Sequence, residues 1–155
     1  MTAAQPLDVQ MMQRALAIAA DAARAGEIPV GAVVYRGEEI LGEGGNRREI
    51  DDDPTAHAEV VAMRQAGRAL GRWRLHDCAM AVTLEPCPMC AGAMVNARLG
   101  RVIWGADDAK AGACKSLYHI HDDPRLNHRL IGLGGVLADE SIALLQAFFK
   151  TRRGR

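Results

Sequence analysis

Two short motifs constrain the fold of this chain most: a His-x-Glu pair at residues 57–59 and a Cys-x-x-Cys pair at residues 87–90. His57, Cys87 and Cys90 offer an imidazole and two thiolates, which are the ligands that zinc prefers. A catalytic zinc takes three protein ligands and leaves a fourth position for water. Glu59 would be a neighbouring carboxylate that does not bind the metal and can move protons. The fold must therefore bring the two motifs together.

Local signals place both motifs near the beginnings of helices. Asp53 is suited to be the N-cap of a helix that has Pro54 as its first residue and runs to about residue 70. The second motif follows an apolar segment at residues 79–84 and opens a helix over residues 88–98. At that helix N-terminus the dipole favours thiolate over thiol.

The spacing of His57 and Glu59 is a difficulty for this arrangement. Residues two apart on a helix point roughly 200° apart, so periodicity alone does not turn both side chains toward one metal. Glu59 must reach through its longer side chain, or the first turn must be irregular.

Other roles exist for a Cys-x-x-Cys pair, namely a redox pair or half of a closed structural zinc site. A closed site needs a fourth ligand, for which Cys78 and Cys114 are the candidates. Neither belongs to a second Cys-x-x-Cys, and both are more simply buried small hydrophobic residues. The pair His119 and His121 has no carboxylate or thiolate at a recognised spacing, and we expect it on a loop surface.

The pattern of apolar residues predicts an α/β protein. Strands are expected at residues 30–35, 39–44, 79–84, 101–105 and 130–136, and helices at 8–25, 54–70, 88–98 and 138–151. The segment 106–127 is irregular. Strands that alternate with helices imply a three-layer α/β/α sandwich around a mixed sheet of about five strands.

Length and composition fit one soluble domain that spans residues 1–155. The N-terminus lacks the features of a signal peptide, and no apolar run approaches the ~20 residues of a membrane span. We therefore expect a cytoplasmic protein without a membrane partner. The formal net charge is zero, which argues against a wholesale basic nucleic-acid binder, although Lys150, Arg152, Arg153 and Arg155 crowd the C-terminus.

Three further features have two interpretations each. Gly42, Gly44 and Gly45 either let backbone approach a ligand or mark a loose strand end. Phe148 could stack on a nucleobase, whereas Phe149 lies in the apolar stripe of the last helix and is expected in the core. The Ala- and Met-rich helix at residues 91–97 is expected to pack in the core, and the alternative is that it forms a dimer interface.

Taken together, the two motifs match the signature of zinc-dependent nucleobase deaminases. Over nearly its whole length the chain resembles the bacterial tRNA-specific adenosine deaminases, which have a cytidine deaminase-like fold. The resemblance rests on residues 27–33, 44–47, 53–59, 84–93, 108–113, 127–129 and 137–140. It implies conversion of adenosine to inosine at the wobble position of a tRNA anticodon stem-loop by a homodimer with one Zn²⁺ per chain.

The resemblance also implies roles for individual residues. His57, Cys87 and Cys90 would bind zinc, and Glu59 would be the catalytic proton shuttle. Substrate contacts are implied for Asn46, Ala58, Leu84, Pro86, Asp108, Lys110, Asn127, Phe148, Arg152 and Arg153. The chain departs from the family at Lys115, where a glycine is usual, and at Arg48, so the loops around both are expected to bend differently.

Two alternative functions remain at this point. The same zinc chemistry could act on a free nucleobase, nucleoside or nucleotide of the cytosine or guanine type. The chain could also be a non-catalytic RNA-binding module with a structural zinc, although such a site has no use for Glu59.

Overall fold

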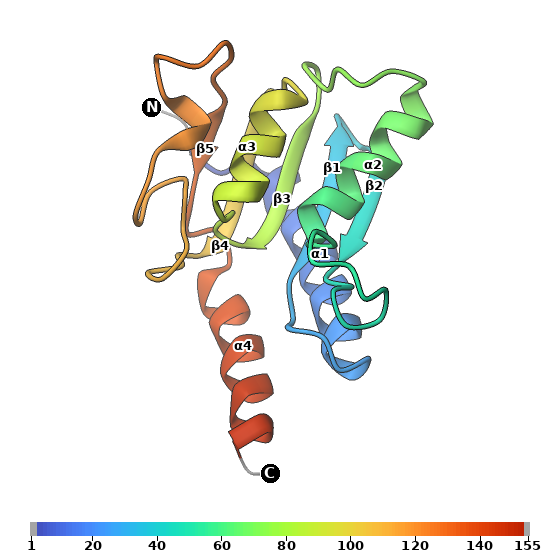
Figure 1. Ribbon diagram of the computed structural model, residues 1–155, viewed down its shortest axis with the longest axis vertical. Helices are drawn as coiled ribbons and strands as arrows, with labels where there is room; N and C mark the ends of the chain where they lie inside the picture. Colours follow the sequence, from blue (N-terminus) through green and yellow to red (C-terminus); the bar gives the residue numbers. More distant parts are fainter. Residues whose placement is uncertain (1–2, 154–155) are drawn as a thin grey trace.

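The computed structural model describes residues 3–152 and the backbone of residue 153 (Figure 1). The elements in chain order are α1 (Pro6–Arg24), β1 (Gly31–Arg36), β2 (Glu39–Gly45), α2 (Ala58–Leu70), β3 (Ala79–Leu84), α3 (Pro88–Asn96), β4 (Arg101–Ala106), the 3₁₀ turn η1 (Ile120–Asp122), β5 (Ile131–Leu133) and α4 (Ala138–Arg153).

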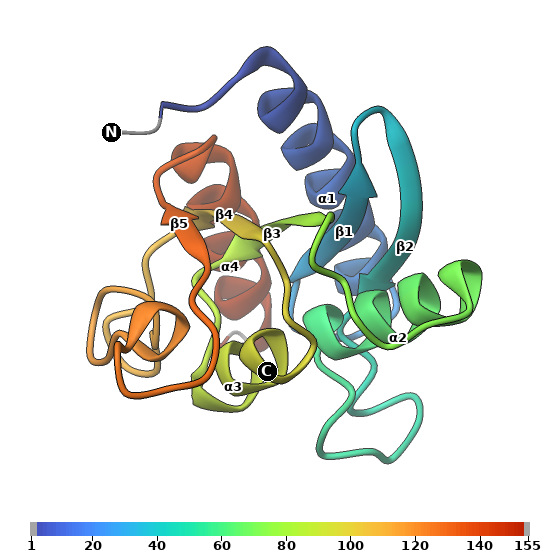
Figure 2. The same ribbon diagram turned by 90° about the horizontal axis from the view of Figure 1, so that it is seen from above.

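The strands form one mixed sheet in the order β2-β1-β3-β4-β5. β1 pairs antiparallel with both β2 and β3, whereas β3, β4 and β5 run parallel to one another. Helices cover both faces: α1 and α4 lie on one side of the sheet, and α2 and α3 lie on the other (Figure 2). The predicted three-layer sandwich with five strands is confirmed.

The side chains of the central strands alternate between the two faces of the sheet and form a hydrophobic core on each face. Because successive side chains of a strand point to opposite faces, neighbouring residues join different clusters. The α2 and α3 side receives Val34, Val82 and Val102, and the α1 side receives Val33, Ala81 and Ile103. The parallel β3 and β4 are buried on both faces, which explains their continuous apolar runs.

Glycines in β2 determine how closely α2 approaches the sheet. A Cβ atom at Gly42 would lie 2.1 Å from the carbonyl oxygen of Ala62, and one at Gly44 would lie 2.4 Å from that of Ala58. The backbone that approaches these glycines is therefore that of a helix. Neither a ligand nor a loose strand end explains them, and their effect is to set the first turn of α2 against the end of β2.

The predicted start of the first helix is corrected by the structure. Gln5 is the N-cap and Asp8 lies within the first turn, where it accepts a hydrogen bond from the Gln5 N–H at 2.9 Å. Asp8 also accepts from the Tyr35 hydroxyl at 2.9 Å and from the Arg101 guanidinium at 2.6 and 2.7 Å. This buried carboxylate joins α1 to β1 and β4.

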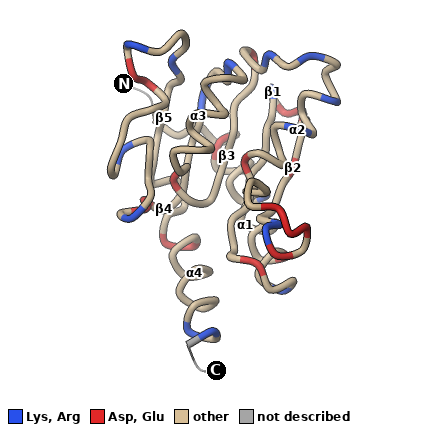
Figure 3. The backbone as a smooth tube through the Cα atoms, in the orientation of Figure 1, with Lys and Arg blue, Asp and Glu red and all other residues tan. Residues whose placement is uncertain are grey.

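The charged residues are unevenly distributed on the backbone trace (Figure 3). Acidic residues gather in the loop between β2 and α2, and Lys150 and Arg152 lie at the far end of α4. No helix in the described part of the chain combines the length and the apolar character that a membrane crossing requires.

Candidate active site

His57 lies immediately before α2 and not within it. It is the N-cap residue with extended backbone angles, φ −74° and ψ 151°. The predicted start at Asp53 is wrong, because the Asp53 carboxylate instead accepts from the N–H and hydroxyl of Thr55, both at 2.8 Å, and closes a turn. The end of the helix is as predicted, with Gly71 in the left-handed conformation after Leu70.

This later helix start removes the difficulty of the His-x-Glu spacing. His57 is extended and Glu59 is helical, so the 200° rotation between them does not apply. Both side chains border the same cavity, which is described below. Neither of the two expected solutions is the one observed, because His57 lies outside the helix as its N-cap residue.

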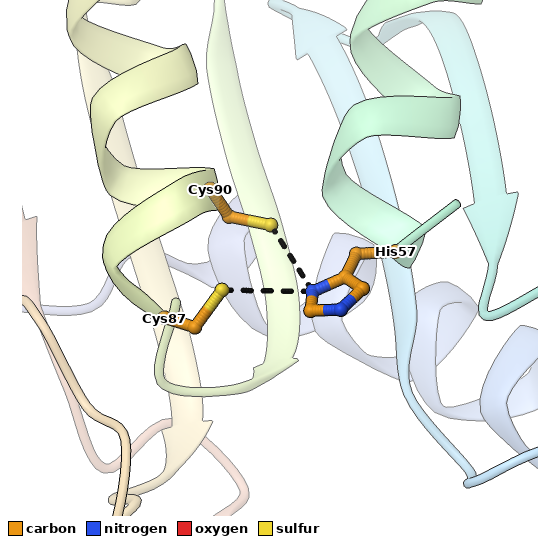
Figure 4. Close-up of side chains that lie close together, drawn as sticks. All are labelled: His57, Cys87 and Cys90. Carbon is orange, nitrogen blue, oxygen red and sulfur yellow. Dashed lines mark hydrogen bonds between the residues drawn. The ribbon is translucent and has the colours of Figure 1, made fainter. Parts of the chain in front are cut away.

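The second motif lies where it was predicted. Cys87 is the N-cap residue of α3, Pro88 follows it in the first turn, and Cys90 completes that turn. The two Sγ atoms each lie 3.5 Å from Nδ1 of His57 (Figure 4). Zn–S bonds of 2.3 Å and a Zn–N bond of 2.0–2.1 Å in a tetrahedron require an N···S distance of ~3.5 Å. The geometry of the three side chains therefore fits a metal ion of this kind.

Hydrogen bonds within the cluster shift the pKa values of His57, Cys87 and Cys90. A hydrogen bond from the Cys90 thiol lowers the pKa of Cys87 to about 4, and the same contact together with burial raises the pKa of Cys90. The hydrogen bond to Cys87 raises the pKa of His57. Since a metal binds thiolates and neutral imidazole, its entry must release protons.

The fourth position of this cluster is open. The group of side chains close enough to share an ion contains only His57, Cys87 and Cys90 among the residues that the structure describes. Cys78 and Cys114 are both buried, as expected for small hydrophobic residues, and belong to the core on the α2 and α3 side. An open position favours a catalytic centre over a closed structural one.

A cavity of about 150 Å³ adjoins the cluster. Engineered cavities of about this volume accept a flat aromatic molecule such as benzene, so the site has room for a nucleobase and not for a whole nucleotide. The lining residues are Ile28, Val30, Asn46, Arg48, His57, Ala58, Glu59, Leu84, Glu85, Cys87, Asp108 and Ala111. They come from the segment before β1, from the ends of β2 and β3 and the residues that follow them, from the starts of α2 and α3, and from the loop after β4.

Glu59 is one of three acidic residues that line this cavity, with Glu85 and Asp108. Only 4% of the residue is exposed, and burial, reinforced by the negative charge of Cys87, raises the pKa of Glu59 to about 7. A carboxyl group with such a pKa exchanges protons readily near neutral pH.

Two buried glutamates that the sequence analysis did not single out hold the loops around the cavity. Glu85, directly after β3, accepts hydrogen bonds from four backbone N–H groups and one hydroxyl, supplied by Asp108, Cys114, Lys115 and Ser116. These donors outweigh burial and keep the pKa of Glu85 below its ordinary value.

Glu27 holds the opposite loop in the same way. It accepts from the N–H groups of Glu49 at 3.2 Å and Ile50 at 2.8 Å. Both glutamates could have been found from the sequence, because each is an acid at the edge of an apolar run and has a proline one or two residues after it. The backbone at Lys115 does not adopt a conformation that requires glycine, because its φ is not positive. Its N–H donates to Glu85.

The structure separates the expected substrate contacts into two groups. Asn46, Ala58, Leu84 and Asp108 line the cavity. The Asn46 carbonyl accepts from the N–H of Arg48 at 3.1 Å, so a ligand would meet the amide nitrogen. Outside the lining lie Pro86, Lys110, Asn127, Phe148 and Arg152, and the side chain of Arg153 lies outside the described residues.

The last helix differs from the prediction. Phe149 is 43% exposed, so the expectation that it packs in the core is wrong. It lines a second hollow of about 570 Å³ together with Lys110, Ile142 and Arg152. Phe148 is half-buried, and the Arg152 guanidinium lies 4.7 Å from the centre of its ring.

Comparison with known proteins adds independent information. The profile of the MafB19-like deaminases matches residues 8–153. The tRNA-specific adenosine deaminase of Haemophilus influenzae is 46% identical over 94% of this chain and 85% of its own length. The protein of that name from Bacillus subtilis is 41% identical over 94% of this chain and 91% of its own length.

Solved structures resemble the chain as well. One from biochemical and structural studies of A-to-I editing by tRNA:A34 deaminases has a TM-score of 0.84, with 38% identity over 88% of this chain and 99% of that one. Guanine deaminase from Bacillus subtilis is 42% identical over 63% of each chain, with a TM-score of 0.61.

Proposed function

Because this chain belongs to the MafB19-like deaminases and to the tRNA-specific adenosine deaminases, we propose that it converts adenosine to inosine at the wobble position of a tRNA anticodon loop. The observation that carries this proposal is a cavity with room for a flat nucleobase, lined by Glu59 and by two of the three side chains that could hold a metal. The relatives that share 41–46% identity with the chain span 93–94% of it.

Zinc is the metal that we propose for His57, Cys87 and Cys90. One neutral imidazole and two thiolates offset the charge of a divalent ion, and the N···S distances of 3.5 Å suit its bond lengths. Bound there, zinc supplies a hydroxide nucleophile at neutral pH, because it lowers the pKa of water to ~7.

Glu59 carries the protons of the reaction in this proposal. It accepts the proton of the attacking water and delivers it to N1 of the adenine, which makes C6 electrophilic. It then takes up the proton of the new C6 hydroxyl and passes it to the 6-amino group, so that the C6 carbonyl forms and the amino group leaves as ammonia. Water is consumed and inosine and ammonia are formed, so Glu59 ends in its initial state.

The other residues of the cavity hold the base in the orientation that these reaction steps require. Asn46 offers its amide nitrogen to the ring or ribose edge. Ala58 is the first residue of α2, where backbone N–H groups have no partner within the helix. A base must leave its stack to enter, and an anticodon loop presents bases that are already splayed, which reduces a cost of a few kcal/mol.

An RNA partner is supported by the surface beside the cavity. Lys110, Phe149 and Arg152 line a hollow next to the loop that contains Asp108. Cationic side chains next to an exposed aromatic ring suit the phosphates and bases of a single-stranded loop. Asn127, Phe148 and Arg153 remain proposed contacts of the same partner.

We further propose a single catalytic domain, a homodimer and a cytoplasmic location, where tRNA is available. A largely apolar groove of about 430 Å³ between α2 and α3 supports the dimer. It contains the half-buried Ala93 and Ala97 and the exposed Trp73, and a second copy of the chain would cover them.

The test is a deamination assay on an arginine tRNA anticodon stem-loop, with free adenosine, cytidine and guanine as competing candidates. Sequencing of the stem-loop after incubation should reveal conversion of the wobble adenosine, and removal of zinc with a chelator should abolish it. Guanine is included because the partial resemblance to a guanine deaminase favours it as the second candidate. Activity on the free compounds alone would overturn the proposal.

A further inference from the structure

A second cluster of metal-ligating side chains lies in the turn η1. We propose that His119, His121 and Asp122 bind a divalent transition-metal ion separate from the one in the active site. Their ligand atoms lie within 4.8 Å of one another. Nδ1 of His119 and Nδ1 of His121 are each 3.8 Å from the same carboxylate oxygen of Asp122. The sequence prediction of a surface loop is wrong for His121, which is 4% exposed.

The environment of the His121 side chain indicates a bound ligand. Its Nδ1 atom is buried and has no hydrogen-bond partner among the described residues. A buried polar atom without a partner costs about 1–3 kcal/mol, and such atoms are rare enough in folded proteins to need an explanation. A cation between this nitrogen and the Asp122 carboxylate would satisfy both groups.

The fold fixes the His121 ring in place. A Cβ atom at Gly132 would lie 2.7 Å from Nε2 of His121, so only glycine leaves room for the ring beside β5. The edge of Trp104 packs against it with a centroid distance of 6.3 Å. The backbone of the turn is tied on both sides, since the Ile120 N–H donates to Ala113 at 2.9 Å and the His121 carbonyl accepts from Leu130 at 2.8 Å.

The other two ligands are free to complete the site. The side chains of His119 and Asp122 are 63% and 46% exposed, and all three ligands border a hollow of about 630 Å³ through which an ion can enter. A tetrahedral ion needs ligand atoms ~3.4 Å apart. Small rotations of the two exposed side chains would close the remaining gap.

The donor set selects the class of ion. Two imidazoles and one carboxylate suit zinc, nickel or cobalt, whereas magnesium and calcium prefer oxygen ligands alone. The ligands come from positions 119, 121 and 122 of one short turn, so an ion there would hold the segment between β4 and β5 and would leave the active site open.

The experiment is a titration of the full-length, zinc-loaded protein with Co²⁺, followed by absorption spectroscopy and by elemental analysis of the bound metals. We expect one Co²⁺ per chain in addition to the zinc, with ligand-field bands and without the charge-transfer band of a cobalt–thiolate bond. His119→Ala and Asp122→Asn should each weaken this binding at least about tenfold. Both residues are exposed, so neither variant endangers folding.

His76→Ala is the matched control, because His76 is exposed and lies outside the cluster. It should bind Co²⁺ as tightly as the unmodified protein. Equal affinity in all four proteins, a thiolate charge-transfer band as the only signal, or no additional ion would each overturn the second site. None of these readouts depends on deaminase activity, so this inference and the proposed function fail separately.

Discussion

Two glutamates, Glu59 at the start of α2 and Glu85 at the end of β3, border the same cavity and are almost equally buried, at 4% and 2% exposure. Their environments nevertheless move them in opposite directions. Burial raises the pKa of Glu59 to about 7, whereas the donors around Glu85 keep its pKa below the ordinary value. Burial alone does not define the role of an acid. Hydrogen-bond donors keep Glu85 ionised at neutral pH, where it organises a loop, whereas Glu59 lies deeper in the fold with fewer donors and can carry a proton.

The substitution Glu59→Gln tests this contrast through the deamination rate, on which we expect the largest effect. Glutamine keeps the size of the side chain but cannot accept and return protons, so deamination should fall by about two to four orders of magnitude. Single-turnover assays on the stem-loop measure the rate. Metal content and the free energy of unfolding should stay close to those of the unmodified protein, because Glu59 is not a ligand in the proposed site.

The same substitution at the other position, Glu85→Gln, should mainly affect stability. Glutamine replaces one carboxylate oxygen by an NH2 group, which is a donor and cannot accept from the backbone N–H groups of the loop. Those N–H groups therefore lose a charged acceptor. We expect a loss of about 2–4 kcal/mol in the free energy of unfolding, measured with urea. Any loss of rate should accompany disorder of the loop around Asp108. If Glu85→Gln were as stable as Glu59→Gln, the assignment of Glu85 as an organising anion would be wrong.

A smaller change, Gly112→Ala, reaches Glu85 indirectly. A Cβ atom at position 112 would lie 2.3 Å from the Glu85 carboxylate, so the carboxylate must move away from its donors. The expected cost is about 1–3 kcal/mol. Because both substitutions disturb one network, their effects in the double variant should not add. Gly92→Ala is the control, since nothing lies within 4 Å of a Cβ there. Additive losses would show that Gly112 does not act through Glu85.

Patterns that rest on local chemistry were predicted well from the sequence. The run at residues 79–84 coincides with β3, because a strand buried on both faces is continuously apolar and ends at a proline. Cys87 and Cys90 lie at the start of α3 as expected, since Pro88 fixes the first helical turn. The three residues expected as metal ligands were chosen by residue type, and the fold brings their side chains close enough to share an ion.

Features that depend on distant partners or on competing local hydrogen bonds were not predictable in the same way. Asp53 and Pro54 resemble a helix start, yet the Thr55 hydroxyl and N–H draw the Asp53 carboxylate into a turn. The first helix was predicted to begin at residue 8, but it begins at Pro6, and the Asp8 side chain also binds Tyr35 of β1 and Arg101 of β4. Phe149 fits an apolar stripe whose facing surface is a hollow. In each case the deciding contact comes from tertiary structure or from a competing local hydrogen bond.

The smallest expected effect concerns the pH dependence of stability. The pKa of Glu85 in the folded protein lies below its ordinary value of 4.5, so the unfolded chain binds this proton more readily. Ionised Glu85 therefore stabilises the fold fully above that value, and the contribution is lost as the pH falls through the folded-state pKa. Urea unfolding of Glu85→Gln should show a shallower loss of stability below about pH 4.5 than the unmodified protein.

Glu59→Gln provides the comparison for this measurement. The pKa of Glu59 is raised, so near pH 4.5 the folded chain already holds this proton while the unfolded chain is still taking it up, and Glu59→Gln should not make the loss of stability shallower. Asp8, whose pKa is lowered mainly by its hydrogen bond with Arg101 against the opposing effect of burial, contributes equally to all three proteins. Parallel curves for Glu85→Gln and Glu59→Gln in this acidic range would mean that the two glutamates do not differ in charge. The contrast on which their separate roles depend would then be lost.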